Sequence, residues 1–100
     1  MSYPEKIEDE ALIITVSGEI DLENSGNLRQ QIRRALDDNK VVSIEMSSVN
    51  YIDSSGIAVL IESKQIAGES NKEFKIVKPS EAVLSVLKLA KLVSFFEIIN

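Results

Sequence analysis

The sequence contains no cysteine and no histidine. Without cysteine, disulfide bonds, thiol catalysis and cysteine-ligated metal sites are excluded. Without histidine, the chain lacks the most frequent general base and metal ligand of proteins, and a serine–histidine–aspartate triad cannot form. These two absences remove several large classes of enzyme and metalloprotein.

Excess positive charge and long hydrophobic runs are also missing. Lysine and arginine total 11 against 16 aspartate and glutamate residues, a net charge of −5, whereas domains that bind nucleic acid normally carry a basic face. The longest uncharged apolar run, residues 56–61, is far too short to span a bilayer. Residues 1–6 lack the basic and apolar segments of a secretory signal. We therefore expect a cytoplasmic protein that neither binds nucleic acid nor inserts into a membrane.

The remaining composition is that of a small folded domain. The chain has 100 residues, of which 44% are hydrophobic and 27% charged. This length leaves room for one core only, so we expect a single domain over residues 1–100.

The first half of the chain predicts two strands, a helix and a further strand. Residues 12–16 are apolar and β-branched, and they predict a strand paired in a hairpin with a short strand near residues 3–7. Apolar residues at helical spacing between positions 28 and 36 predict a helix that ends near residues 37–39. Residues 41–46 predict the next strand and 47–51 a loop. The polar side of the helix is interpreted as solvated surface: Arg29, Gln30, Arg33 and Arg34.

The second half alternates helices and strands. A helix is predicted from Ser54 to a C-cap at Gly68, followed by a strand at residues 74–77. Ser80 is the predicted N-cap of a third helix, and residues 95–99 predict a last strand. The order ββαβαβαβ indicates an α/β fold, with helices packed on a mostly parallel sheet of about five strands and one antiparallel edge strand.

An enzyme built on Ser54 and Ser55 is not supported. A nucleophile elbow needs glycine two residues before the serine, where this chain has Ile52 or Asp53. No glycine-rich phosphate loop or dinucleotide fingerprint occurs. The acidic groups at residues 8–10 and 37–38 are interpreted as a solvated turn and a solvated helix end. We expect no enzyme activity, no cofactor and no metal site.

The two serines do have a distinctive position, because an apolar helix begins there. The first turn of a helix has unpaired N–H groups and a partial positive charge, so it tolerates added negative charge. Asp53 or Ser54 can therefore be a helix cap. A serine at this position can also accept a phosphate, and the two roles are compatible.

Residues 53–60, with the sequence DSSGIAVL, resemble the signature of STAS domains, in particular those of bacterial anti-sigma factor antagonists. Residues 17–21, with the sequence SGEID, resemble an element that follows the second strand in that family. The segment after Pro79 is similar to the family's third helix, and the resemblance covers nearly the whole chain. One departure is Lys91, which stands where relatives often have glycine.

The resemblance implies a partner-switching protein. In that family an anti-sigma factor with serine-kinase activity phosphorylates the first serine of the motif, here Ser54, and a metal-dependent serine phosphatase removes the phosphate. The unphosphorylated form binds the anti-sigma factor and releases the sigma factor. The implied switch-site and partner-binding residues are Asp21, Asp53, Ser55, Gly56 and Ile57, with Leu60 as a further candidate.

Simpler interpretations exist for some of these residues. Asp21 can be a turn or cap residue only, and Ile57 and Leu60 can belong to the core. Other functions are open as well. A small STAS subunit of a membrane lipid-transport complex would dock on an ATPase without phosphorylation. A STAS domain that binds a small molecule or a nucleotide is a third possibility, although the sequence shows no recognisable pocket for one.

Overall fold

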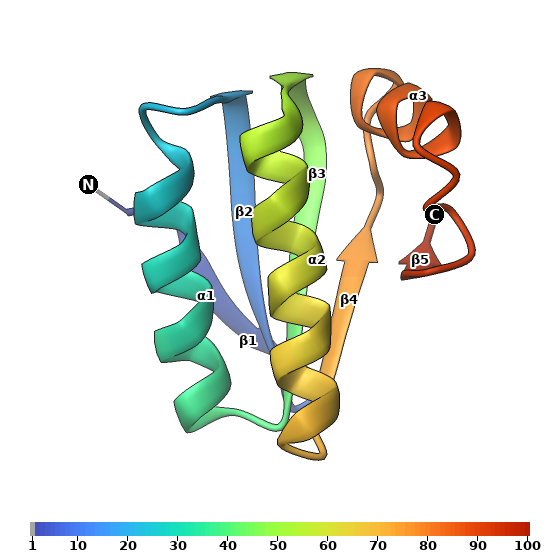
Figure 1. Ribbon diagram of the computed structural model, residues 1–100. Coiled ribbons are helices and arrows are strands. Elements are labelled where there is room, and N and C mark those ends of the chain that lie inside the picture. Colours follow the sequence, from blue (N-terminus) through green and yellow to red (C-terminus); the bar gives the residue numbers. More distant parts are fainter. Residues whose placement is uncertain (1) are drawn as a thin grey trace.

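The computed structural model describes residues 2–100 and contains one five-stranded sheet (Figure 1). The strands follow one another across the sheet in chain order; the first pair is antiparallel and all others are parallel. The predicted order ββαβαβαβ and the antiparallel edge strand are thereby confirmed. The elements are β1 (Glu5–Glu8), β2 (Ala11–Ile20), α1 (Ser25–Asp38), β3 (Val41–Ile52), α2 (Ser54–Glu69), β4 (Glu73–Val77), α3 (Glu81–Leu89) and β5 (Glu97–Ile99).

The core lies between the sheet and the helices α1 and α2, which run side by side over one face of it (Figure 1). Alternate residues of β2 point into this layer, since Ile14 and Val16 are fully buried while their neighbours are partly exposed. The helices supply Leu28, Ile32 and Leu60 to the same cluster. Helix α3 packs against β3. Its N-cap is Ser80, as predicted, and the hydroxyl oxygen of Ser80 accepts a hydrogen bond from the N–H of Val83.

The loop predicted at residues 47–51 is wrong, because β3 continues without a break to Ile52. Its second half pairs with the second half of β2, where Ser17 lies opposite Ser48 and Gly18 opposite Val49. The segment 17–20 therefore lies within β2 rather than after it. Two register shifts interrupt the regular alternation, and Gly18 adopts a φ of +80° between them. Polar side chains such as Ser48 remain on the exposed side, which explains why the pattern resembled a loop.

The predicted C-cap at Gly68 is also wrong. Gly68 lies inside α2, and the helix ends instead at Ser70, whose N–H donates to the carbonyl of Ile66 at 3.1 Å. The left-handed residue that follows is Asn71, with φ of +62°. Asparagine is one of the few residues other than glycine that adopt this conformation readily, so Gly68 was not needed for it.

The polar side of α1 is more than solvated surface. The Arg29 guanidinium Nε lies 2.9 Å from the Glu62 carboxylate of α2, and an Arg33 Nη lies 3.1 Å from the same oxygen. All three side chains are at least one-third exposed, so these ion pairs contribute little stability. They do connect α1 to α2 on the outside of the helical layer.

Candidate functional site

The predicted site residues lie at one edge of the sheet, where β2 and β3 end side by side. Ile20 is paired with Ile52, so Asp21 and Asp53 leave neighbouring strands at the same point. The N–H of Asp53 donates to the carbonyl of Ile20 at 3.1 Å, which joins the two chain segments beyond the last pair. Asp21 therefore lies at the end of its strand near Asp53, as expected.

Asp53 is the N-cap of α2. Its carboxylate accepts hydrogen bonds from the N–H of Ser55 at 2.9 Å and of Gly56 at 3.3 Å, and from the Ser55 hydroxyl at 2.5 Å. Its carbonyl accepts from the N–H of Ile57 at 3.0 Å. The Asp53 side chain thus pairs two N–H groups of the first helical turn, those of Ser55 and Gly56, that would otherwise lack partners.

These bonds favour the charged form of the Asp53 carboxyl. The hydrogen bond from the Ser55 hydroxyl lowers its pKa most. Partial desolvation raises the pKa, but the backbone N–H groups of Gly56, Ser55 and Leu22 lower it further, and the net direction is downward. Asp53 therefore carries its negative charge throughout the neutral range.

The two serines of the motif differ in their surroundings. The Ser55 side chain is partly buried and its hydroxyl is bound to Asp53. Ser54 occupies the first helical position and is exposed, and its hydroxyl has no hydrogen-bond partner within residues 2–100. Of the two oxygens, that of Ser54 is the one an incoming protein can reach.

Gly56 and Ile57 face inward. A Cβ on Gly56 would lie 2.7 Å from side-chain carbons of both Ile20 and Ile52, so α2 can pack onto the strand ends only because this residue has no side chain. The close approach made possible here is to the protein's own isoleucines and not to another backbone. Ile57 is 8% exposed and Leu60 is fully buried, so both belong to the core and offer a partner little surface.

The β2–α1 connection, residues 21–24, is held by reciprocal hydrogen bonds. The Asp21 carboxylate accepts from the N–H groups of Glu23 at 3.0 Å and Asn24 at 3.3 Å, and the Asn24 side chain accepts from the N–H of Asp21 at 2.9 Å. The Asn24 amide also donates to the carbonyl of Glu19 at 2.7 Å. Asp21 therefore is a turn residue, as the simpler interpretation expected, and it remains partly exposed beside the site.

Leu22 of this connection is 81% exposed although its side chain is apolar. The sequence analysis did not single it out. A leucine between two acidic residues, outside any apolar repeat, was the signal that could have identified it as an exposed position. Because the N–H of Leu22 helps to lower the pKa of Asp53, the connection lies directly against the cap of α2.

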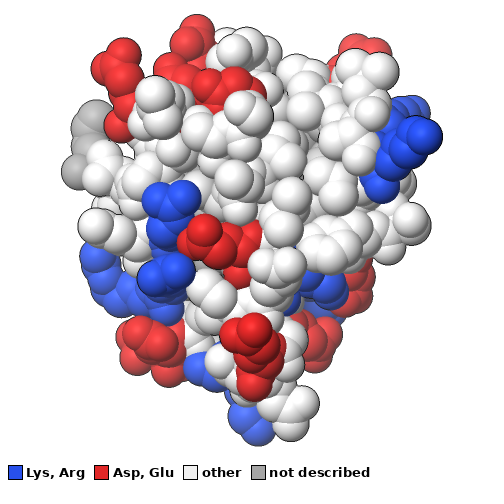
Figure 2. Space-filling model, viewed as in Figure 1, with Lys and Arg blue, Asp and Glu red and all other residues white. Residues whose placement is uncertain are grey.

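The charge of this end is negative. Glu19, Asp21, Glu23 and Asp53 all lie at the strand ends or in the connection that follows. In Figure 2, acidic side chains gather at the upper left of the molecule, over the β2–α1 connection, and on the face shown no basic side chain lies among them. An approaching partner therefore meets an acidic surface.

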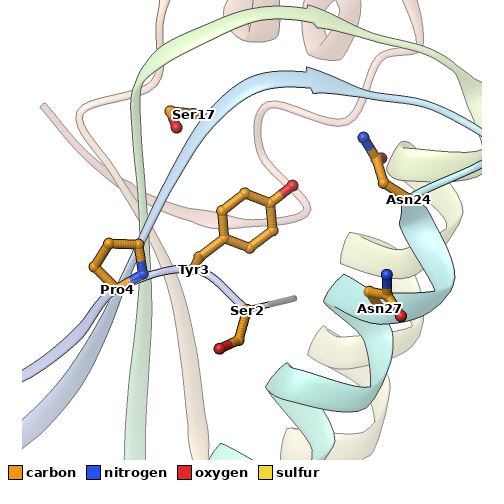
Figure 3. Close-up of a pocket in the computed structure, with 6 residues that line it drawn as sticks. All are labelled: Ser2, Tyr3, Pro4, Ser17, Asn24 and Asn27. Carbon is orange, nitrogen blue, oxygen red and sulfur yellow. The ribbon is translucent and has the colours of Figure 1, made fainter.

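A small cavity of 330 Å³ lies between the N-terminal segment and α1 (Figure 3). The ring of Tyr3 extends into it, with the hydroxyl on the side of Asn24. Burial raises the pKa of Tyr3, and the negative charge of Asp21 raises it further. The cavity is lined by Ser2, Tyr3, Pro4, Ser17, Asn24 and Asn27.

Gln31 of α1 fixes this N-terminal segment. Its side chain is 4% exposed; it accepts from the N–H of Tyr3 at 2.9 Å and donates to the carbonyl of Tyr3 at 2.8 Å. It also donates to the Glu5 carboxylate at 2.6 Å. The N-terminal segment is thus joined to the helix that begins at the candidate site.

Within residues 2–100, no three histidine, cysteine, aspartate or glutamate side chains come together in a way that could hold a metal ion. Over the same residues, no helix has both the length and the apolar character needed to cross a membrane.

Comparison with known proteins places the fold. A model of the STAS domain matches residues 3–100. A candidate anti-sigma factor antagonist from Thermotoga maritima is 26% identical, with 98% of this chain and 86% of that chain covered and a TM-score of 0.89. An anti-sigma factor antagonist from Mycobacterium paratuberculosis is 24% identical, with 100% and 91% covered and a TM-score of 0.85. The phosphorylated form of the Bacillus cell fate determinant SpoIIAA is 16% identical, with 99% and 92% covered and a TM-score of 0.74.

Proposed function

Because the chain belongs to the STAS domain family, we propose that it is a cytoplasmic anti-sigma factor antagonist controlled by phosphorylation of Ser54. The unphosphorylated form binds an anti-sigma factor that is also a serine kinase, and this binding releases the sigma factor. A metal-dependent phosphatase restores the unphosphorylated form. The chain acts here as a substrate and binding partner rather than as an enzyme.

The observation that carries this proposal is the difference between the two hydroxyls. Ser54 is exposed at the first position of α2 and has no hydrogen-bond partner in the described chain, whereas the Ser55 hydroxyl is bound to Asp53. A kinase needs an exposed oxygen that can turn toward its phosphate donor. Ser54 meets that requirement without any rearrangement of the helix.

A phosphate on Ser54 would leave the fold intact and would lie exposed on the surface of the protein. The N–H groups of Ser55, Gly56 and Ile57 already bind Asp53 and are not open to a phosphate. The helix dipole still offsets part of the added charge of about −1.5 to −2. The phosphate would therefore extend into solvent, beside Asp53 and near Asp21.

In a complex, the same group would oppose binding. The interface would have to remove water from a dianion and hold it close to two carboxylates. A loss of about 3 kcal/mol in binding free energy corresponds to an affinity weakened by more than roughly a hundredfold. The fold would be retained while the partner is released.

The test uses the ATP-binding anti-sigma factor encoded nearest to this chain in its own genome. We expect the purified kinase and ATP to phosphorylate the wild type and Ser55→Ala, but not Ser54→Ala, as mapped by mass spectrometry. Ser54→Asp should bind the partner at least roughly a hundredfold more weakly than Ser54→Ala in isothermal titration calorimetry.

Two results would contradict the proposal. One is equal affinity of Ser54→Asp and Ser54→Ala for the anti-sigma factor. The other is phosphate on neither serine of the motif; combined with binding to a transport ATPase, it would favour a subunit of a lipid-transport complex.

A further inference from the structure

We infer that Leu22 is the apolar anchor of the partner interface and that the anti-sigma factor receives it in an apolar pocket rimmed by basic side chains. This inference rests on the proposed function, because it specifies how the same partner contacts the surface around Ser54. It concerns a residue that lies outside the DSSG motif and more than thirty positions before it in the sequence.

The exposure of Leu22 has no explanation within the folded chain. Its side chain is 81% exposed and it does not belong to the hydrophobic core. Removing a leucine side chain from water is favourable, and at this position almost none of that gain is realised in the isolated protein. A partner that covers Leu22 would recover it.

The backbone that carries Leu22 is held in place before any partner arrives. Asp21 and Asn24, on either side of it, hydrogen-bond each other's N–H groups at 3.3 and 2.9 Å. The Leu22 N–H faces the Asp53 carboxylate and helps to lower the pKa of that group. Because the position is already ordered, binding loses little backbone entropy, a property expected of an interface anchor.

The charges around Leu22 indicate what surrounds it in a complex. Asp21 and Glu23 are its chain neighbours, and Glu19 and Asp53 lie at the adjoining strand ends. Covering Leu22 also brings these carboxylates against the partner surface. Basic side chains around an apolar pocket would satisfy both requirements, whereas a purely apolar surface would leave the carboxylates without counter-charges.

The position of Leu22 also connects the anchor to the switch. The backbone N–H of Leu22 faces the Asp53 carboxylate, and Ser54 is the residue after Asp53. A phosphate on Ser54 would keep the surroundings of the leucine hydrated and add negative charge at the mouth of the proposed pocket. Leu22 thus provides the apolar contact, and the state of Ser54 decides whether that contact can form.

The chain offers a matched control in Leu89, which is 85% exposed at the end of α3. We expect Leu22→Ala to weaken binding of the unphosphorylated protein to the purified anti-sigma factor by about thirtyfold or more, as for an interface anchor. Leu89→Ala should stay within about twofold of the wild type, as for a residue outside the interface. Thermal unfolding followed by circular dichroism should be unchanged for both, because neither side chain belongs to the core.

Association kinetics test the proposed basic rim of the pocket separately. Glu23→Gln should slow association and reduce its dependence on salt, measured by stopped-flow mixing from low to physiological ionic strength. An association rate that does not depend on salt for the wild type would overturn the basic rim.

The remaining outcomes separate this inference from the function on which it rests. If Leu22→Ala binds as tightly as the wild type while Ser54→Asp does not bind, the anchor is wrong and the switch stands. If the wild type neither binds the anti-sigma factor nor accepts phosphate, both are wrong.

Discussion

Leu22 and Leu89 are exposed to nearly the same degree, yet the regions around them are built differently. Around Leu22, the side chains of Asp21, Asn24 and Asp53 hydrogen-bond the backbone of the β2–α1 connection and of the start of α2. In the C-terminal segment, residues 89–99, the turn that follows α3 is held by hydrogen bonds between backbone groups, such as that from the N–H of Leu92 to the carbonyl of Leu87 at 2.8 Å.

The C-terminal segment exposes more apolar side chains than the end that carries Ser54. The C-terminal segment exposes Leu89, Val93, Phe95 and Ile99, whereas the end that carries Ser54 exposes Leu22 and Tyr51. Judged by apolar exposure alone, the C-terminal segment would be the better candidate for an interface. Negative charge and a reachable hydroxyl favour the other end as the partner surface. Apolar exposure alone therefore does not identify the binding surface of this protein.

The largest expected effect is at Gly56, because the packing of the end that carries Ser54 depends on this residue. We expect Gly56→Ala to lower the free energy of unfolding by about 1–3 kcal/mol, because the new Cβ would collide with Ile20 and Ile52. Gly68→Ala is the control in the same helix. No atom lies within 4 Å of a Cβ at this position, so the substitution should raise the free energy of unfolding by about 0.5–1 kcal/mol. Urea unfolding of both variants measures the effect. An equal gain in the two would show that the helix start is loosely packed.

The next test compares the two helix caps. Ser80 accepts one hydrogen bond, from the N–H of Val83 at 3.2 Å, and Ser80→Ala should lose about 1 kcal/mol at any pH. Asp53→Ala removes a cap that accepts several hydrogen bonds, so this variant should lose more free energy of unfolding at neutral pH than Ser80→Ala.

The Asp53 loss should also depend on pH. The pKa of Asp53 is lowered in the folded protein, so its stabilisation is present above the ordinary aspartate value of about 3.9 and disappears as the pH falls through the lower folded value. The difference between wild type and Asp53→Ala in urea midpoints should therefore shrink in acid, while that for Ser80→Ala stays constant. Parallel pH profiles for the two variants would contradict the charged cap.

The smallest effect is expected in the C-terminal segment. Lys91 adopts a φ of +60°, which strains a residue with a Cβ. Lys91→Gly should raise the free energy of unfolding by roughly 0.5–1 kcal/mol, and Lys91→Ala should leave it unchanged. Thermal unfolding scans of both variants provide the measurement. If Lys91→Gly and Lys91→Ala unfold at the same temperature, the positive φ of Lys91 does not strain the C-terminal segment.

Local periodicity was enough to predict the order of the elements. The apolar repeat of α1 and the hydroxyl at Ser80 are signals contained within a few residues, and both were correct. The second half of β3 was missed because its polar residues are ordered by Ser17 and Gly18, about thirty positions away. The end of α2 could not be predicted for a different reason. Gly68 and Asn71 are both residue types that often end helices, and the local sequence does not show which of them does so here.

The same reasoning applies to the site. Asp53, Ser54 and Ser55 were identified because the motif is continuous in the sequence. The difference between the two serines was not predictable, because it depends on side-chain geometry: the Ser55 hydroxyl turns back to Asp53 and the Ser54 hydroxyl does not. Leu22 was missed because its position beside Asp53 results from the pairing of β2 with β3, which the local sequence does not show.

The buried Gln31 has a consequence for the edge of the sheet. All four residues of β1 are exposed, so this edge strand is kept in place by its ladder with β2 and by the bonds of Gln31 to Tyr3 and Glu5 rather than by apolar burial. If β1 detached, β2 would become the edge of the sheet, with unpaired backbone groups along a strand rich in isoleucine and valine. The bonds of Gln31 and the ladder with β2 therefore act together to keep β1 along the edge of β2.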